Sequence, residues 1–95
     1  MIYLDSGATT LEKPLAVAQA MARAVGEMSS PGRGNYPASQ RAAQTAFACR
    51  EAAAELFGVP SPEQVVFTGN ATHGLNIAIR TLVRPGSRVA VSGYE

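Results

Sequence analysis

The chain has 95 residues, of which 46% are hydrophobic and 16% charged, and its formal net charge is +1. This length gives one small domain at most, and the hydrophobic content excludes a chain that is disordered by composition. Because a dedicated binder of nucleic acid or of an anionic membrane normally carries a basic excess, we expect neither partner.

Three further features predict a cytoplasmic protein. The one cysteine, Cys49, cannot form a disulfide within the chain, which is typical of a reducing compartment. The first residues lack the basic region and apolar core of a signal peptide, and no apolar run reaches the ~20 residues of a membrane span. Cys49 itself has no nearby histidine, so we predict a small buried or half-buried hydrophobe and not a nucleophile.

Residues 1–12 are predicted to form an arm. Ile2, Tyr3 and Leu4 are apolar and are followed by turn-forming residues from Asp5, which predicts a short strand or an extended segment and then a turn. Ala8 and Thr9 come next, and these small residues either line a pocket or simply continue the turn.

The first predicted helix covers residues 14–28 and starts at Pro14, whose fixed backbone angle suits a first helical turn. Its apolar residues recur at helical spacing and are predicted to face the core: Val17, Met21, Val25 and Met28. Lys13, just before this helix, is predicted to be a solvated side chain.

Residues 29–37 are predicted to form a loop, because proline and glycine interrupt the helical pattern there. The loop displays the guanidinium of Arg33 and the amide of Asn35. Such a loop either reaches a ligand or a second subunit, or serves only as a connector.

A second helix is predicted over residues 39–57, with Gly58 as its carboxyl-terminal cap. A βαβ unit is predicted over residues 64–92, with strands at Val65–Phe67 and Val89–Val91 and a helix between them that carries Leu75, Ile79 and Leu82 on one face. Two strands joined through a helix of this length favour a parallel pair with a right-handed crossover. The predicted fold class is therefore α/β, with helices packed on a mostly parallel sheet.

The turn between the first strand and the helix of this unit is the candidate binding site. The first N–H groups of a helix have no partner within it, and the helix dipole adds partial positive charge there, so an anion such as phosphate is favoured. Gly69 permits a sharp turn, Ala71 allows close approach, and Thr72 adds a hydroxyl. The same residues also fit plain helix capping by Asn70 or Thr72. No Gly-Lys-Ser/Thr follows, so the turn is not a Walker loop.

Taken in order, several segments resemble the opening of the class V aminotransferase family, in its cysteine desulfurase and selenocysteine lyase branch. The matching segments are Ile2-Tyr3-Leu4-Asp5-Ser6-Gly7-Ala8-Thr9-Thr10, Lys13-Pro14, Pro31-Gly32-Arg33, Val66-Phe67-Thr68-Gly69-Asn70-Ala71-Thr72 and Leu75-Asn76. The resemblance implies the amino-terminal part of a fold type I large domain that depends on pyridoxal 5′-phosphate. It also implies a homodimer that acts on cysteine or selenocysteine, releasing alanine from cysteine and leaving the sulfur as an enzyme persulfide.

Carried over by residue, the resemblance assigns Ala71, Thr72 and His73 to the cofactor, with Ala71 and Thr72 at its phosphate. It places Ala8 and Thr9 near the substrate, and Arg33 and Asn35 on a loop that approaches the active site at the dimer interface. Many relatives have Glu in place of His73 and His in place of Tyr36.

The resemblance also implies that the lysine that binds the cofactor, the catalytic cysteine and the histidine over the cofactor ring all follow Glu95. No catalytic residue and no metal site is therefore predicted within the 95 residues, and we expect the segment alone to be catalytically silent. Two other hypotheses stay open: a stand-alone phosphate- or nucleotide-binding domain, and a non-catalytic remnant or interaction module.

Overall fold

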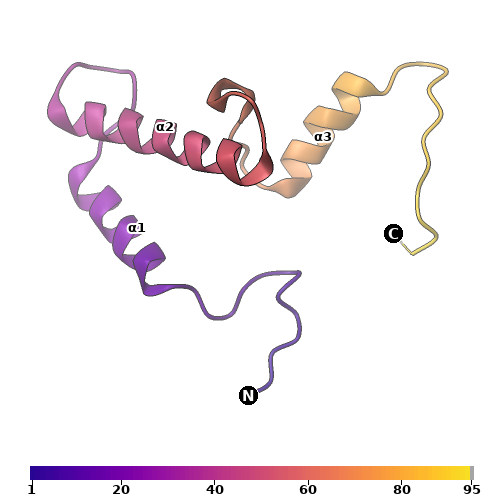
Figure 1. Ribbon diagram of the computed structural model, residues 1–95, viewed down its shortest axis with the longest axis horizontal. Coiled ribbons are helices and arrows are strands. Elements are labelled where there is room, and N and C mark those ends of the chain that lie inside the picture. The colour runs from indigo at the N-terminus through magenta and orange to yellow at the C-terminus, as the bar shows by residue number, and fades with distance from the viewer. Residues whose placement is uncertain (95) are drawn as a thin grey trace. The chain divides into compact units, whose positions relative to one another are not determined.

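The computed structural model describes residues 1–94. Over this range it contains three α-helices and one short 3₁₀ helix: α1 (Leu15–Glu27), α2 (Pro37–Phe57), η1 (Pro62–Gln64) and α3 (Ala71–Leu82) (Figure 1). The chain divides into two compact units, Met1–Gln64 and Val65–Glu95, and each is described by itself.

The helix ends follow local chemistry. The sequence predicts helix over residues 14–28, and α1 begins directly after Pro14 and ends at Glu27. It predicts helix over residues 39–57, and α2 begins two residues earlier because Pro37 occupies its first turn, where a missing N–H costs nothing.

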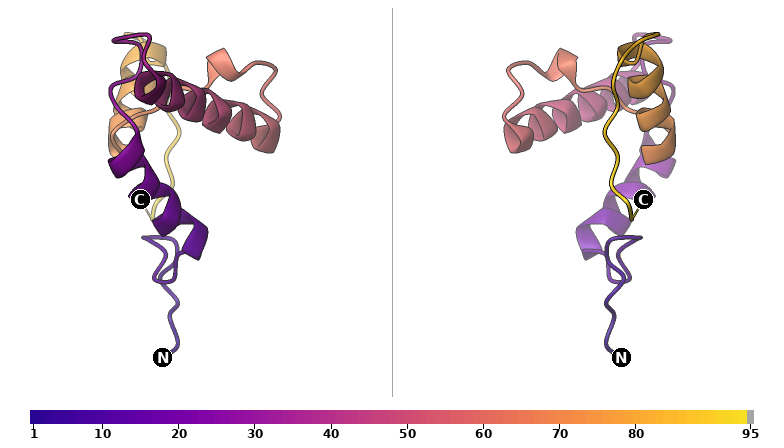
Figure 2. Two further views of the ribbon diagram at one scale, coloured as in Figure 1. Left: turned by 90° about the vertical axis from the view of Figure 1, so that its left-hand side faces the viewer. Right: turned by 90° about the vertical axis from the view of Figure 1, so that its right-hand side faces the viewer.

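The carboxyl end of α2 turns back on itself through Gly58. This residue has a φ of 64°, a left-handed conformation that glycine adopts without the steric cost of a side chain. The N–H of Val59 donates to the carbonyl of Ala54 at 2.8 Å, which closes the helix end. The chain then forms η1 beside α2, and Figure 2 shows this short helix next to the longer one. Ala54, only 5% exposed, is the buried apolar residue of α2.

The predicted sheet is not formed in the part of the chain that the structure describes. Neither residues 65–67 nor residues 89–91 are assigned as strands, and the arm at residues 2–4 is irregular as well. A helix satisfies its backbone hydrogen bonds within one segment, whereas a strand needs a neighbouring strand, and none pairs with these segments here. The α/β fold with its parallel strands therefore stays a prediction.

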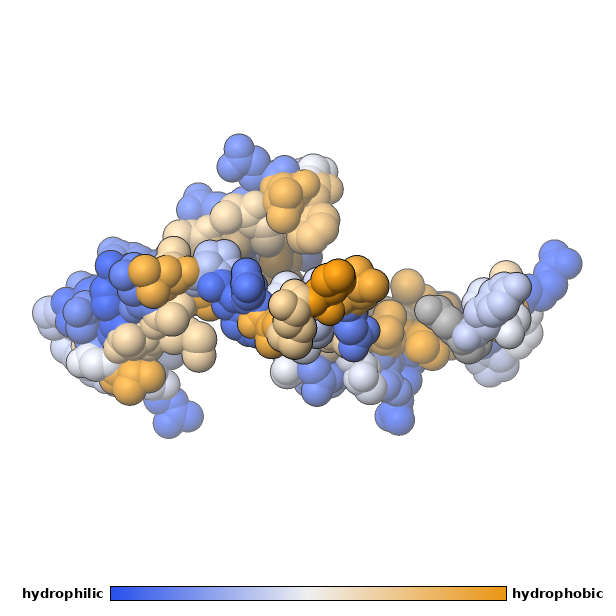
Figure 3. All heavy atoms as spheres, turned by 90° about the horizontal axis from the view of Figure 1, so that it is seen from below, coloured by the Kyte–Doolittle hydropathy of each residue, from blue (hydrophilic) through white to orange (hydrophobic). Residues whose placement is uncertain are grey.

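The predicted core face of α1 is largely wrong for this structure, because three of its four side chains are exposed to solvent, whereas Met28 is half-buried. Val17, Met21 and Val25 keep 43%, 66% and 88% of their area accessible. The apolar face of α3 is exposed in the same way at Leu75, Ile79 and Leu82. Figure 3 shows apolar residues on the molecular surface in the view from below. Among the described residues, Ala54 is the one buried hydrophobic side chain, so the apolar stripes lack a surface to pack against.

Cys49 is also exposed, which corrects the prediction of a buried or half-buried thiol. No other described element covers this side of α2 enough to exclude solvent from the thiol. Across residues 1–94, no helix combines the length and the apolar character that crossing a membrane requires.

We predict that Ser61→Ala raises the pKa of Glu63 toward its ordinary value of 4.5. The Ser61 hydroxyl donates to the Glu63 carboxylate, and this hydrogen bond is the main cause of the lowered pKa, followed by a backbone hydrogen bond and by the charge of Arg50. A carbon-detected NMR titration of the Glu63 side chain measures the change.

Because the folded-state pKa is lowered, this hydrogen bond stabilises η1 above about pH 4.5, and the stabilisation is lost as the pH falls through the folded-state pKa. Ser61→Thr retains the hydroxyl and serves as the control. An unchanged Glu63 titration in Ser61→Ala would contradict the assignment.

Candidate functional site

The amino-terminal end of α3 is closed by the side chain of Asn70. Its Oδ1 accepts a hydrogen bond from the N–H of His73 at 2.8 Å, and its carbonyl accepts from the N–H of Gly74 at 3.1 Å. This is the N-cap arrangement, in which an Asx side chain replaces the missing helical acceptor. The capping interpretation of the turn is therefore correct for Asn70.

Capping leaves two donors of the first turn without a partner. Among the residues that the structure describes, the N–H groups of Ala71 and Thr72 donate to no protein acceptor, and the Thr72 hydroxyl makes no hydrogen bond. Both residues are exposed. Two adjacent amides at the positive end of a helix, with a hydroxyl beside them, form a donor set suited to an anion.

His73 contributes to the turn in a way that the sequence did not reveal. Its Nδ1 accepts a hydrogen bond from the N–H of Gly69 at 3.3 Å. The hydroxyl of Thr68 donates to the carbonyl of Asn70 at 2.9 Å, so the turn is held from both ends. Because Nδ1 is already occupied, His73 can offer only Nε2 to a ligand while this bond is made. The one sequence signal for this role is a histidine four residues after a glycine at a helix start.

The predicted substrate residues Ala8 and Thr9 lie in a turn of the arm. The N–H groups of both donate to the carbonyl of Asp5, at 3.1 Å for Ala8 and 3.4 Å for Thr9, and the hydroxyl of Tyr3 donates to the carbonyl of Thr9 at 2.6 Å. The two residues therefore continue the turn.

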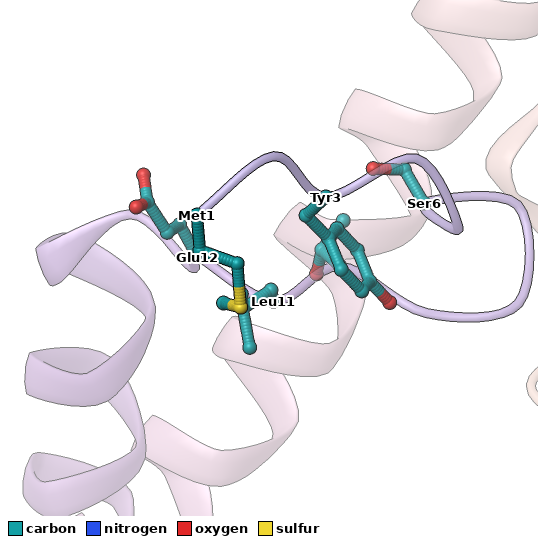
Figure 4. Close-up of a pocket in the computed structure, with 6 residues that line it drawn as sticks. Met1, Tyr3, Ser6, Leu11 and Glu12 are labelled. Carbon is teal, nitrogen blue, oxygen red and sulfur yellow. The ribbon is translucent and has the colours of Figure 1, made fainter.

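A cavity of about 390 Å³ lies in the same arm, but Ala8 and Thr9 do not line it. It is lined by Met1, Tyr3, Ser6, Thr10, Leu11 and Glu12, and Figure 4 shows these side chains around it. The Tyr3 hydroxyl is already engaged with backbone carbonyls, and Glu12 contributes a carboxylate to the cavity lining.

Arg33 and Asn35 lie on the loop between α1 and α2, and both are exposed. Asn35 Oδ1 accepts a hydrogen bond from Gln40 Nε2 at 2.6 Å, whereas Arg33 makes no hydrogen bond or ion pair with another described residue. Ala71, Thr72 and His73 thus share one turn of the unit Val65–Glu95, and the arm and loop residues belong to the unit Met1–Gln64.

Comparison with known proteins decides the family. The family model described as aminotransferase class-V matches residues 2–95, which is nearly the whole chain. The chain belongs to the class V aminotransferase family. The resemblance seen in the sequence segments is thereby confirmed.

Individual relatives within the class V family agree with this assignment. A protein described as a probable cysteine desulfurase, from Vibrio cholerae serotype O1, is 30% identical over 100 aligned residues, which cover all of this chain and 24% of the relative. The selenocysteine lyase of Homo sapiens and the cysteine desulfurase SufS of Plasmodium falciparum are each 32% identical over 87% of this chain, covering 18% and 15% of their own lengths. The chain thus spans less than a quarter of the length of these curated relatives. No solved structure gives a significant match.

We predict that Asn70→Ala weakens the first turn of α3 by about 1 kcal/mol, since the N–H of His73 loses its acceptor. Hydrogen exchange of the α3 amides should accelerate by a factor of about five, which NMR measures directly. Asn70→Asp preserves the acceptor and should exchange at the original rate. Equal exchange in the alanine variant and the unmodified chain would show that the cap contributes nothing.

Proposed function

We propose that this chain supplies the phosphate-binding turn of an enzyme that depends on pyridoxal 5′-phosphate and resembles cysteine desulfurase. The proposal is supported by membership of the class V aminotransferase family and by the donor set at the start of α3. The single observation that carries it is that the N–H groups of Ala71 and Thr72 are left without acceptors after Asn70 has capped the helix.

In this proposal the cofactor phosphate accepts hydrogen bonds from the amides of Ala71 and Thr72 and from the Thr72 hydroxyl. Hydrogen bonds to a charged acceptor are stronger than those between neutral groups, and the helix dipole adds to the attraction. Asn70 and His73 position the turn by holding its backbone from the two ends, and His73 keeps Nε2 for the edge of the cofactor.

Pyridoxal phosphate supplies an electron sink when bound, and that chemistry needs a lysine that attaches the cofactor. The only lysine of the 95 residues is Lys13, whose ammonium donates to the carbonyl of Thr10 in the arm. This position gives no support for an attachment role. The chain's own contribution is therefore binding and orientation, and we propose that it is catalytically silent by itself.

For the whole enzyme, the names of the relatives support cysteine or selenocysteine as substrate. We propose alanine as the product from cysteine. We further propose a cytoplasmic homodimer in which Ala8 and Thr9 lie near the substrate and Arg33 and Asn35 approach the active site at the dimer interface. An assay of the whole enzyme for alanine formed from cysteine, with and without pyridoxal phosphate, tests the proposed activity.

The same spare amides also fit a second function, a general phosphate- or nucleotide-binding domain, because a capped helix start does not by itself select one phosphate ester. Calorimetric titration with pyridoxal phosphate, ATP and inorganic phosphate separates the two functions. Preference for pyridoxal phosphate supports the enzyme, and equal or tighter binding of ATP supports the alternative. Absence of binding by all three ligands favours a non-catalytic module.

We predict that Thr72→Val weakens pyridoxal phosphate binding between about tenfold and a hundredfold. Valine retains the branched shape of threonine but removes one hydrogen bond to a charged acceptor, for which the loss is about 1.5–3 kcal/mol. The same calorimetric titration measures the dissociation constant.

Thr81→Val is the matched control, because the Thr81 hydroxyl donates to the carbonyl of Ile77 within α3, away from the first turn. Its affinity for the cofactor should be unchanged. Equal affinities of the Thr72 and Thr81 variants would refute a phosphate contact through Thr72.

A further inference from the structure

The loop between α1 and α2, residues 29–36, is closed by hydrogen bonds between its two ends. The N–H of Ser29 donates to the carbonyl of Ala38 at 3.3 Å, and the hydroxyls of Ser29 and Tyr36 share a hydrogen bond of 2.7 Å. The loop contains proline and glycine and has no regular structure, so without such bonds its backbone would sample many conformations.

Ser39 joins the two ends of this loop to α2. Its side chain is 1% exposed, the most fully buried side chain in the part of the chain that the structure describes. Its hydroxyl donates to the carbonyl of Ser30 at 2.9 Å, while its N–H donates to the carbonyl of Tyr36 at 3.0 Å. A buried hydroxyl is favourable only when it is hydrogen-bonded, so the burial of Ser39 and the closure of the loop depend on each other.

A second contact, between Gly34 and the ring of Tyr36, also restrains the loop. A Cβ placed on Gly34 would lie 2.5 Å from Cε1 of Tyr36, so the tyrosine ring occupies the space that any other residue at position 34 would fill. This position of the ring is the one that brings the Tyr36 hydroxyl to Ser29. Gln40 on α2 holds the side chain of Asn35 through a hydrogen bond of 2.6 Å.

We propose that Ser39 is a positioning residue that holds loop 29–36 closed before any ligand or partner binds, with Gly34 as the glycine that the closed form requires. Arg33 lies between these fixed points and makes no hydrogen bond within the described chain, so its guanidinium is presented from an ordered frame. Binding of a ligand group to Arg33 then costs little conformational entropy, because the loop is already ordered. A role for the ordered Arg33 in an active site rests on the proposed function, whereas the closure of the loop is independent of that function.

Limited digestion with trypsin, in the absence of pyridoxal phosphate, tests the proposal. Trypsin cleaves after arginine, and Arg33 lies in the loop while Arg23 and Arg50 lie within α1 and α2. Ser39→Ala leaves the Ser30 carbonyl without its donor, and we expect cleavage after Arg33 to rise roughly tenfold with unchanged cleavage after Arg23 and Arg50. Mass spectrometry of the fragments gives the three rates separately.

Ser30→Ala is the matched control, because it removes a neighbouring hydroxyl and retains the carbonyl that Ser39 binds; its cleavage should match the unmodified chain. An unchanged rate after Arg33 in Ser39→Ala overturns the proposal. If Ser39→Ala instead increases cleavage at all three sites, the helices have been lost, and the Gly34→Ala variant is used in its place. A selective increase in cleavage of Gly34→Ala after Arg33 supports the closed loop. An unchanged cleavage rate after Arg33 in Gly34→Ala rejects it. Because no cofactor is present, a failure here leaves the phosphate-binding proposal untouched, and the reverse also holds.

Discussion

The first turn of α3 is the constraint on which the functional account depends. A helix cannot satisfy its own first N–H groups, and here Asn70 supplies two acceptors, its side chain for His73 and its carbonyl for Gly74. The amides of Ala71 and Thr72 are left facing outward at the positive end of the helix dipole. His73 further restrains the turn by accepting from Gly69. Capping and anion binding are therefore compatible, since they use different amides of the same turn.

The sequence predicts the helices well and the remaining structure less well, for one physical reason. A helix forms its hydrogen bonds locally, so Pro14, Pro37 and Gly58 mark where α1 and α2 begin or end, and the structure agrees with these marks to within two residues. The strands predicted at residues 65–67 and 89–91 depend on neighbours, and the pattern of valines alone cannot supply them. In the same way, the spacing of Val17 and Met21 predicts an apolar stripe correctly, but their exposure shows that no other described element packs against it.

In the candidate site too, local features can be predicted from the sequence, whereas features that depend on packing or on side-chain rotation cannot. The residue types around Gly69 and Thr72 are sufficient to predict the Asn70 cap, which the structure confirms, because capping depends on nearest neighbours in sequence. Anion binding at the same turn stays a prediction. The occupation of His73 Nδ1 could not be predicted, because it depends on the rotation of one side chain. Ser39 was missed for a different reason: a serine near a helix start is common, and only its burial and its bond to Ser30 distinguish it. Membership of the class V aminotransferase family then gives the turn a chemical context that geometry alone does not provide.

The most direct measurement of the central claim is an NMR titration of the ¹⁵N-labelled chain with pyridoxal phosphate and, separately, with pyridoxal, which lacks the phosphate. The account predicts that the phosphate ester shifts the amide signals of Ala71 and Thr72 downfield, as expected for new hydrogen bonds to a charged acceptor, and that pyridoxal leaves both signals in place. Equal responses to the two ligands, or a response to pyridoxal phosphate confined to residues outside the first turn of α3, would contradict it.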